Sequence, residues 1–213
     1  MGFMKKLKTL KGEVDQDLLK NGKLGRAIIV NLAIGGTTVQ TNNAPVERVC
    51  DFTLEVALDD TPRYEATAHQ RVPEYALAEI QPGSSVVAVR VDAADPQRVA
   101  IDWATPPPTV RVAPEAGAIT AADILANGES VKAVIVQSEP LGMQNQNGVD
   151  VYALVITLLP DGAPPEQLQV GNPVPSGAVP LLYPGSKVHA RVMPDNHQAC
   201  VVDWDATLAS PPA

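Results

Sequence analysis

The chain has 213 residues, a net charge of −8 and a hydrophobic content of 45%, which together predict an acidic, folded protein. This charge argues against a nucleic-acid partner, because binding to phosphates requires a basic surface. No apolar run approaches the roughly 20 residues needed to cross a bilayer, and no signal-peptide core follows the basic N-terminus. We therefore expect a cytoplasmic protein, with the inner face of the membrane as the alternative location.

The segment 1–14 predicts a basic amphipathic helix, because its apolar residues recur at helical spacing while lysines lie largely elsewhere. Such a helix could make weak contact with an anionic membrane or dock on a partner. The alternative is a solvated N-terminal segment with no contact. The candidate contact residues are Phe3, Lys5, Lys6, Leu7, Lys8 and Leu10.

Two later stretches repeat the same order of landmarks, and the spacing between them shortens by only a few residues along the chain. Such a repeat predicts two copies of one small fold, over residues 15–105 and 119–207. The repeated landmarks are Asn21-Gly22 and Asn127-Gly128, Pro82-Gly83-Ser84 and Pro184-Gly185-Ser186, and Asp102-Trp103 and Asp203-Trp204.

Each copy begins with a short predicted helix, Asp15–Lys20 or Ala121–Ala126, which ends at an Asn-Gly pair that is typical of a left-handed stop. A strand and a polar loop follow in each copy. The strands are Gly25–Ala33 and Ser130–Ser138, and the loops are Gly35–Val46 and Gly142–Gly148.

Alternating apolar residues predict a second strand in each copy, and a third strand follows after a turn. The Pro-Gly-Ser turn then leads into a final hairpin, in which Val87, Val89 and Val91 face Val99, Ile101 and Trp103. Five strands with short connections predict a mainly all-β protein made of two tandem small antiparallel β-barrels, each preceded by a short helix. The barrels could be OB-like or SH3-like.

Prolines mark the segment between the copies. Residues 106–118 contain Pro106-Pro107-Pro108 and Pro114, which predict a stiff linker that joins neither sheet. The last residues, 208–213, predict a flexible tail.

Three residue types recur on the last hairpin of both copies. Arg90 with Asp102, and Arg191 with Asp203, lie on the face opposite the valines and predict a cross-strand ion pair. A catalytic role would require a further acid, base or nucleophile, and none recurs. Trp103 and Trp204 predict core residues that close each barrel, with ligand stacking as the alternative.

Other candidate residues differ between the copies. Asp92 and Asp95 could hold calcium, but Met193 and Asn196 replace them, so turn chemistry is favoured. Cys50 and Cys200 predict small buried hydrophobic residues. His69, His189 and His197 occupy unrelated positions, and no catalytic, metal or cofactor motif is present. The sequence therefore favours a protein that is not an enzyme and has no cofactor.

The order of landmarks, including Val89-Arg90-Val91, Asp92–Pro96 and Val99–Trp103, resembles uncharacterised small β-barrel domains that are common in actinobacterial proteins. These domains often occur in tandem or attached to membrane segments. The resemblance covers both copies and implies a bacterial accessory or envelope-associated protein. It implies no catalytic residues.

We expect an interaction or scaffolding protein that binds a protein partner or self-associates, with the loops Gly35–Val46 and Gly142–Gly148 as the contact surface. One alternative is a peripheral membrane protein anchored by the N-terminal helix. A second is a small-molecule binder or enzyme that uses a cleft between the copies.

Overall fold

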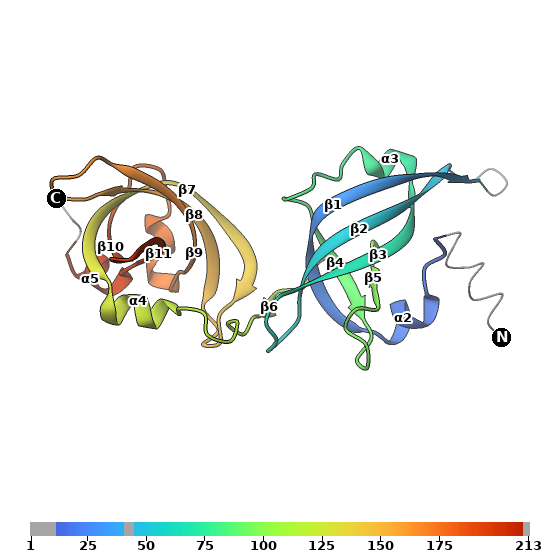
Figure 1. Ribbon diagram of the computed structural model, residues 1–213, viewed down its shortest axis with the longest axis horizontal. Coiled ribbons are helices and arrows are strands. Elements are labelled where there is room, and N and C mark those ends of the chain that lie inside the picture. Colours follow the sequence, from blue (N-terminus) through green and yellow to red (C-terminus); the bar gives the residue numbers. More distant parts are fainter. Residues whose placement is uncertain (1–11, 41–44, 211–213) are drawn as a thin grey trace. The chain divides into compact units, whose positions relative to one another are not determined.

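A computed structural model describes residues 12–40 and 45–210, and the chain divides into one unit up to Val110 and a second from Arg111. The division lies within the Pro-rich segment 106–118. The first unit is a curled antiparallel sheet with two short helices (Figure 1). Its elements are α2 (Gln16–Asn21), β1 (Lys23–Val39), β2 (Glu47–Ala57), β3 (Tyr64–Pro73), α3 (Glu74–Leu77), β4 (Val86–Val91) and β5 (Val99–Ile101).

The second unit has the same architecture. Its strands are ordered β11-β10-β7-β8-β9, and the first unit has the matching order β5-β4-β1-β2-β3. The repeat in the sequence is therefore a repeat of one fold. The elements of the second unit are α4 (Ala121–Asn127), β7 (Glu129–Gln144), β8 (Asp150–Leu159), β9 (Glu166–Pro173), the 3₁₀ helix η1 (Ser176–Leu181), β10 (Lys187–Met193), β11 (Asn196–Val202) and α5 (Trp204–Ala209).

Strand order distinguishes between the two barrel types left open by the sequence. The first strand of each unit lies at the centre and pairs with both the second and the fourth strand. A short helix, α3 or η1, connects the third strand to the fourth. This connectivity is that of an OB-like, five-stranded Greek-key barrel.

The core of each barrel consists of the alternating apolar residues predicted from the sequence. Cys50, Phe52, Leu54 and Val56 of β2 are at most 1% exposed, and β8 contributes an equivalent buried row. The final hairpin has the predicted register, with Val89 opposite Ile101 and Val91 opposite Val99. Both cysteines are buried and free, as expected, and burial raises the pKa of the Cys200 thiol to about 12.

A side-chain amide closes each barrel between its third and fifth strands. In the first barrel, Gln70 Nε2 donates to Ile101 O at 2.9 Å and Gln70 Oε1 accepts from Ile101 N at 3.0 Å. In the second, the shorter Asn172 accepts from Val202 N at 2.7 Å, and its Nδ2 has no hydrogen-bond partner among the described residues. The second barrel is therefore closed less completely than the first.

The first part of each predicted polar loop is strand, which corrects the boundaries expected from the sequence. β1 continues to Val39 and β7 to Gln144. Register shifts between Ile34 and Thr38, and between Pro140 and Met143, let the strands pass through glycine-containing stretches without losing their partners. The surface proposed for partner contact is correspondingly smaller, and residues 41–44 lie outside the described residues.

The Asn-Gly pairs also differ from expectation. Gly22 has φ −66° and ψ 150°, and Gly128 has φ −75° and ψ 151°, so neither is left-handed. A Cβ on either glycine would lie 2.6 Å from a helix carbonyl, Leu18 O or Ile124 O. Glycine is required at these two positions because the backbone passes so close to the last turn of the preceding helix that a Cβ would clash with its carbonyl oxygen.

The linker is not wholly separate from the sheets, contrary to the prediction. Between the prolines, β6 (Val110–Arg111) pairs with β7, and Val112 N donates to Gln144 O at 2.9 Å. Val110 is 2% exposed. A short run without proline has free backbone N–H groups and can therefore pair, although the prolines around it cannot.

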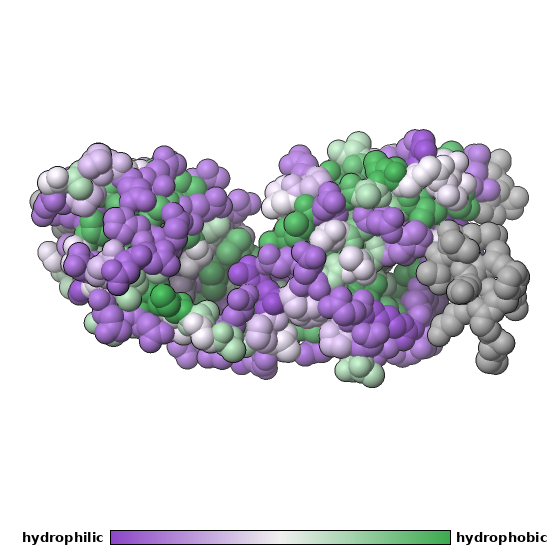
Figure 2. All heavy atoms as spheres, in the orientation of Figure 1, coloured by the Kyte–Doolittle hydropathy of each residue, from purple (hydrophilic) through white to green (hydrophobic). Residues whose placement is uncertain are grey.

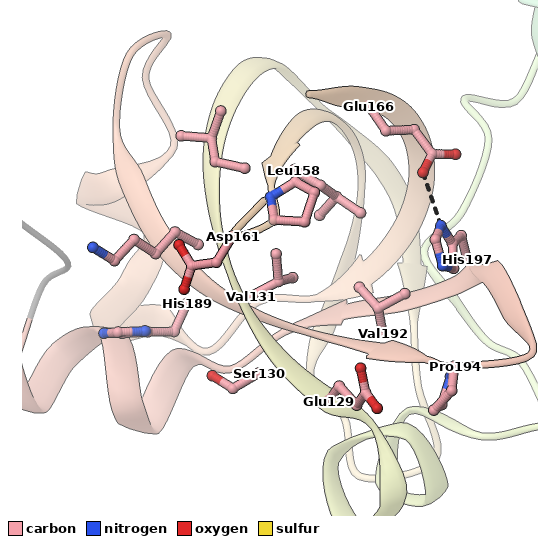
Figure 3. Close-up of a pocket in the computed structure, with 13 residues that line it drawn as sticks. Glu129, Ser130, Val131, Leu158, Asp161, Glu166, His189, Val192, Pro194 and His197 are labelled. Carbon is pink, nitrogen blue, oxygen red and sulfur yellow. Dashed lines mark hydrogen bonds and ion pairs between the residues drawn. The ribbon is translucent and has the colours of Figure 1, made fainter. Parts of the chain in front are cut away.

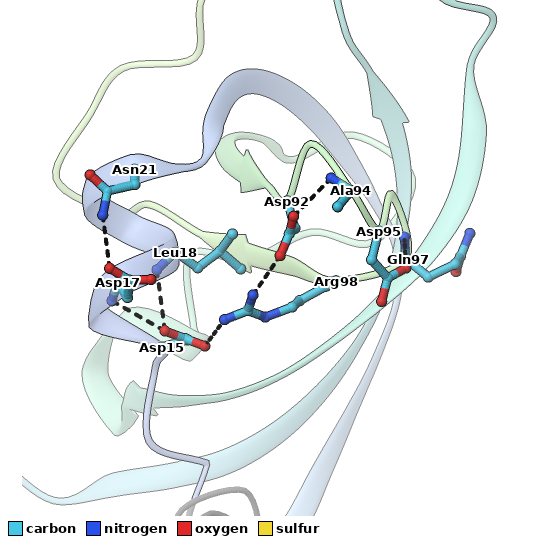
Figure 4. A network of polar contacts seen from close by, with 9 residues as sticks. All are labelled: Asp15, Asp17, Leu18, Asn21, Asp92, Ala94, Asp95, Gln97 and Arg98. Carbon is cyan, nitrogen blue, oxygen red and sulfur yellow. Dashed lines mark hydrogen bonds and ion pairs between the residues drawn. The ribbon is translucent and has the colours of Figure 1, made fainter.

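One polar network holds α2 against the β4–β5 turn of the first barrel (Figure 4). Arg98 donates to both Asp15 and Asp92. Asp15 also caps α2 by accepting from Leu18 N, and Asp92 accepts from Ala94 N in the turn. In the second barrel, the position equivalent to Arg98 is Ala199, so this network belongs to the first barrel alone.

We expect acid to destabilise the first barrel more steeply than the second. The hydrogen bond from Arg98 lowers the pKa of Asp15, and the hydrogen bonds from Ala94 N and Arg98 lower that of Asp92. A carboxylate with a depressed native pKa stabilises the fold above its unfolded pKa, about 4, and this contribution is lost as pH falls through the native value.

Urea unfolding at pH values from neutral to strongly acidic, followed by tryptophan fluorescence, measures this difference. Trp204→Phe leaves Trp103 to report on the first barrel, and Trp103→Phe leaves Trp204 to report on the second. Arg98→Gln should flatten the acid dependence of the first barrel only. Equal acid dependence of the two barrels would contradict the assignment.

Among the described residues, no helix is both long enough and apolar enough to cross a membrane. On the face drawn in Figure 2, hydrophilic residues predominate and apolar side chains interrupt them in patches. Large exposed apolar residues occur in both barrels and include Val30, Ile34, Trp103, Val136 and Tyr183.

Candidate functional site

The second barrel has an open pocket of about 420 Å³ at its mouth (Figure 3). The pocket lies where Glu129–Val131 of β7 extend beyond their pairing with β8, which begins at Lys132. Apolar side chains of Val131, Leu158 and Val192 form the floor. A concave site with an apolar floor and a few polar groups is the usual form of a small-ligand site, and barrel mouths are a common place for one.

Charged side chains form the rim of this pocket. The carboxylates are those of Glu129, Asp161 and Glu166, and Lys132 also lines the pocket. Glu166 Oε2 lies 2.9 Å from His197 Nδ1. His189, the second histidine of the rim, has Nε2 2.9 Å from Ser210 O.

The equivalent opening of the first barrel is filled. Leu58, which corresponds to Pro160, is 7% exposed and belongs to the core. It packs so closely on Gly25, the counterpart of Val131, that a Cβ there would lie 2.4 Å from Leu58 Cδ2. The two copies therefore differ at the barrel mouth: the side chain of Leu58 fills it in the first barrel, and it is open in the second.

A second difference lies beside the first. Tyr64 of the first barrel reaches across to the β4–β5 turn and donates from its hydroxyl to Pro96 O at 3.1 Å. Glu166 and His197 occupy the corresponding positions in the second barrel. The tyrosine that closes the first barrel is thus replaced by a contact between two exposed side chains, Glu166 and His197, which water and a ligand can reach.

The structure places the predicted Arg and Asp residues together in both copies, as cross-strand ion pairs. Arg90 Nε donates to Asp102 Oδ2 at 3.1 Å, and Arg191 Nε donates to Asp203 Oδ2 at 3.3 Å. Each arginine also donates to the carbonyl of the glycine that ends the first helix. These residues tie the helix to the sheet and do not line the pocket of the second barrel.

Hydrogen bonds decide the ionisation of Asp102. Burial raises the pKa of this carboxyl, but hydrogen bonds from Thr105 and Arg90 outweigh it and hold the pKa below its ordinary value. The carboxylate is therefore charged in the native state and acts as a structural acceptor.

The two tryptophans have different environments, although the sequence predicted one role for both. Trp204 is 6% exposed and donates from Nε1 to Pro173 O at 2.9 Å, as expected for a core residue. Trp103 is 43% exposed and lies beside Phe52, with ring centroids 6.0 Å apart. The prediction of a buried plug is wrong for Trp103.

The cause lies in the residues that follow each tryptophan. After Trp204 the chain forms α5, capped by Asp203 and held to β10 by a 2.9 Å hydrogen bond from His189 N to Thr207 Oγ1. The positions that match Thr207–Ala209 are Pro106–Pro108 in the first copy, and prolines cannot continue such a helix. The indole of Trp103 is therefore left beside an open pocket of about 420 Å³ instead of under a helix.

The remaining sequence candidates do not form a site. Asp92 and Asp95 accept turn hydrogen bonds from Ala94 N and Gln97 N. The proposed contact residues Phe3, Lys5, Lys6, Leu7, Lys8 and Leu10 lie outside the described residues, so membrane contact stays a prediction. Sequence reasoning set aside His189 and His197 because they lacked counterparts, yet both line the pocket.

No family model matches the sequence, and no curated protein matches it. Among solved structures, the chain is similar to one in the structure of a replication protein A heterotrimer bound to ssDNA, with 13% identity and a TM-score of 0.19. The match covers 80% of this chain and 44% of that one, so this chain spans less than half of its length.

This match corrects the exclusion of a nucleic-acid partner that was based on net charge. The protein in that structure is bound to ssDNA. Net charge averages over the whole chain, whereas binding depends on one local surface, so a value of −8 does not decide the question. A likeness at this TM-score carries no argument about what the present chain binds.

Proposed function

We propose that the protein is a non-enzymatic binding protein in which the second barrel holds a small ligand at its mouth. The single observation that carries this proposal is the difference between the copies: Leu58 and Tyr64 fill the mouth of the first barrel, and Pro160 and Glu166 leave that of the second open. The first barrel is then the structural copy. Binding of a protein partner, or self-association, stays a separate prediction.

Differences between duplicated domains support this assignment because both copies must satisfy the same folding requirements. The ion pairs, the closing amides and the helix-ending glycines occur in both. The residues at the barrel mouth, by contrast, differ between the copies. Opening the mouth leaves the apolar side chain of Val131 only partly buried, which disfavours folding slightly and so indicates another use for the space.

A fragment screen with the full chain tests the proposal. We expect small water-soluble compounds to shift the backbone amide NMR signals of the non-proline residues within 129–132, 158–161 and 192–197. Val131→Phe places a ring in the pocket and should abolish these shifts. Trp103→Phe, in the first barrel, is the control and should leave them unchanged. Fragments that bind only elsewhere, or equally well to Val131→Phe, would overturn the proposal.

A further inference from the structure

The rim carboxylates give the pocket of the second barrel a chemical preference. Glu166 is paired with His197, but the carboxylates of Glu129 and Asp161 accept no hydrogen bond and form no ion pair among the described residues. Figure 3 shows these two side chains on either side of Val131, so the apolar floor lies between them. A ligand on that floor is within reach of both.

Charge counting points in the same direction. Three carboxylates line the pocket against one lysine, so the lining is net negative unless both His189 and His197 are protonated. The first barrel offers no such arrangement, because Tyr64 and Leu58 occupy the equivalent space with uncharged groups.

From this juxtaposition we infer that the pocket takes a protonated amine attached to a compact apolar body. The apolar body packs on Val131, Leu158 and Val192, and the ammonium donates charge-assisted hydrogen bonds to Glu129 or Asp161. No Phe, Tyr or Trp is among the described residues that line the pocket, so an ammonium with N–H donors is favoured over a quaternary cation, which relies on such aromatic faces. The inference rests on the proposed function of this pocket and names its ligand class.

Three probes of similar shape separate charge from fit: phenethylamine, phenethyl alcohol and hydrocinnamate, which are cationic, neutral and anionic at neutral pH. Titrations of the full chain, followed by amide NMR shifts, give their affinities. We expect the amine to bind about tenfold more tightly than the alcohol, and the acid to bind most weakly. Added salt should weaken binding of the amine and leave that of the alcohol unchanged.

The double variant Glu129→Gln with Asp161→Asn keeps the size of the rim and removes its unpaired charge. It should bring the affinities of amine and alcohol together. Asp59→Asn, at the equivalent turn of the first barrel, is the matched control and should preserve the preference for the amine.

The outcomes distinguish this inference from the proposed function. Equal binding of alcohol and amine at the pocket would overturn the charge preference and leave the pocket as a ligand site. A preference that survives the double variant would also overturn the inference, because other groups would then be its source. If none of the three probes shifts the pocket signals, the inference fails, and the fragment screen alone decides on the proposed function.

Discussion

Gln70→Leu is expected to destabilise the first barrel by about 2–5 kcal/mol, because it leaves two buried backbone groups without partners. Gln70 is 3% exposed and supplies both a donor and an acceptor to the backbone of Ile101. Leucine has a similar volume, so the loss comes from the unpaired N–H and C=O rather than from a cavity. Urea unfolding of the Trp204→Phe background, followed by Trp103 fluorescence, measures the effect.

The second barrel provides the matched comparison. Asn172→Leu removes one hydrogen bond and also removes the unpartnered Nδ2, so its cost should be clearly smaller than that of Gln70→Leu. Asn172→Gln introduces the longer side chain that the first copy already accommodates, and should stabilise the second barrel by about 1 kcal/mol. Equal costs for the two leucine variants would show that the amides do not close the barrels.

The strands and their pairing could be predicted from the sequence because burial imposes a period of two on each strand. Cys50 to Val56 and the hairpin of Val89 and Ile101 follow this rule in the first copy, and β8 and the hairpin of β10 and β11 follow it in the second. The ends of β1 and β7 could not be placed, since bulges let a strand continue through glycines that are typical of loops. The closing role of Gln70 was also hidden, because a single buried amide has no sequence signature.

The candidate site was missed for a different reason. Requiring each feature to occur in both copies selected the shared folding residues, such as Arg90 and Asp102, and discarded His189 and His197. A binding site that belongs to one copy alone is removed by that requirement. The informative signal was the difference at two equivalent positions. Leu58 and Tyr64 fill the mouth of the first barrel, whereas Pro160 and Glu166 replace them in the second and leave its mouth open.

Gly22→Ala and Gly128→Ala are each expected to destabilise their own barrel by about 1–3 kcal/mol, as other overpacked positions do. In both cases the added Cβ would lie 2.6 Å from a backbone carbonyl, which cannot move without releasing the helix from its C-terminal hydrogen bond. Gly177→Ala is the control: nothing lies within 4 Å of the Cβ it would add. It should change stability by less than about 0.5 kcal/mol.

Asparagine at the same positions separates this explanation from the left-handed stop that the Asn-Gly sequence suggests. A left-handed residue tolerates asparagine better than alanine, because the short polar side chain adopts that conformation more readily. The extended backbone at Gly22 and Gly128 gives asparagine no such advantage, and its side chain is larger. Gly22→Asn should therefore cost at least as much stability as Gly22→Ala in urea unfolding. A milder effect of asparagine would mean that the turn is left-handed in solution and that crowding by Leu18 O is not the reason for glycine.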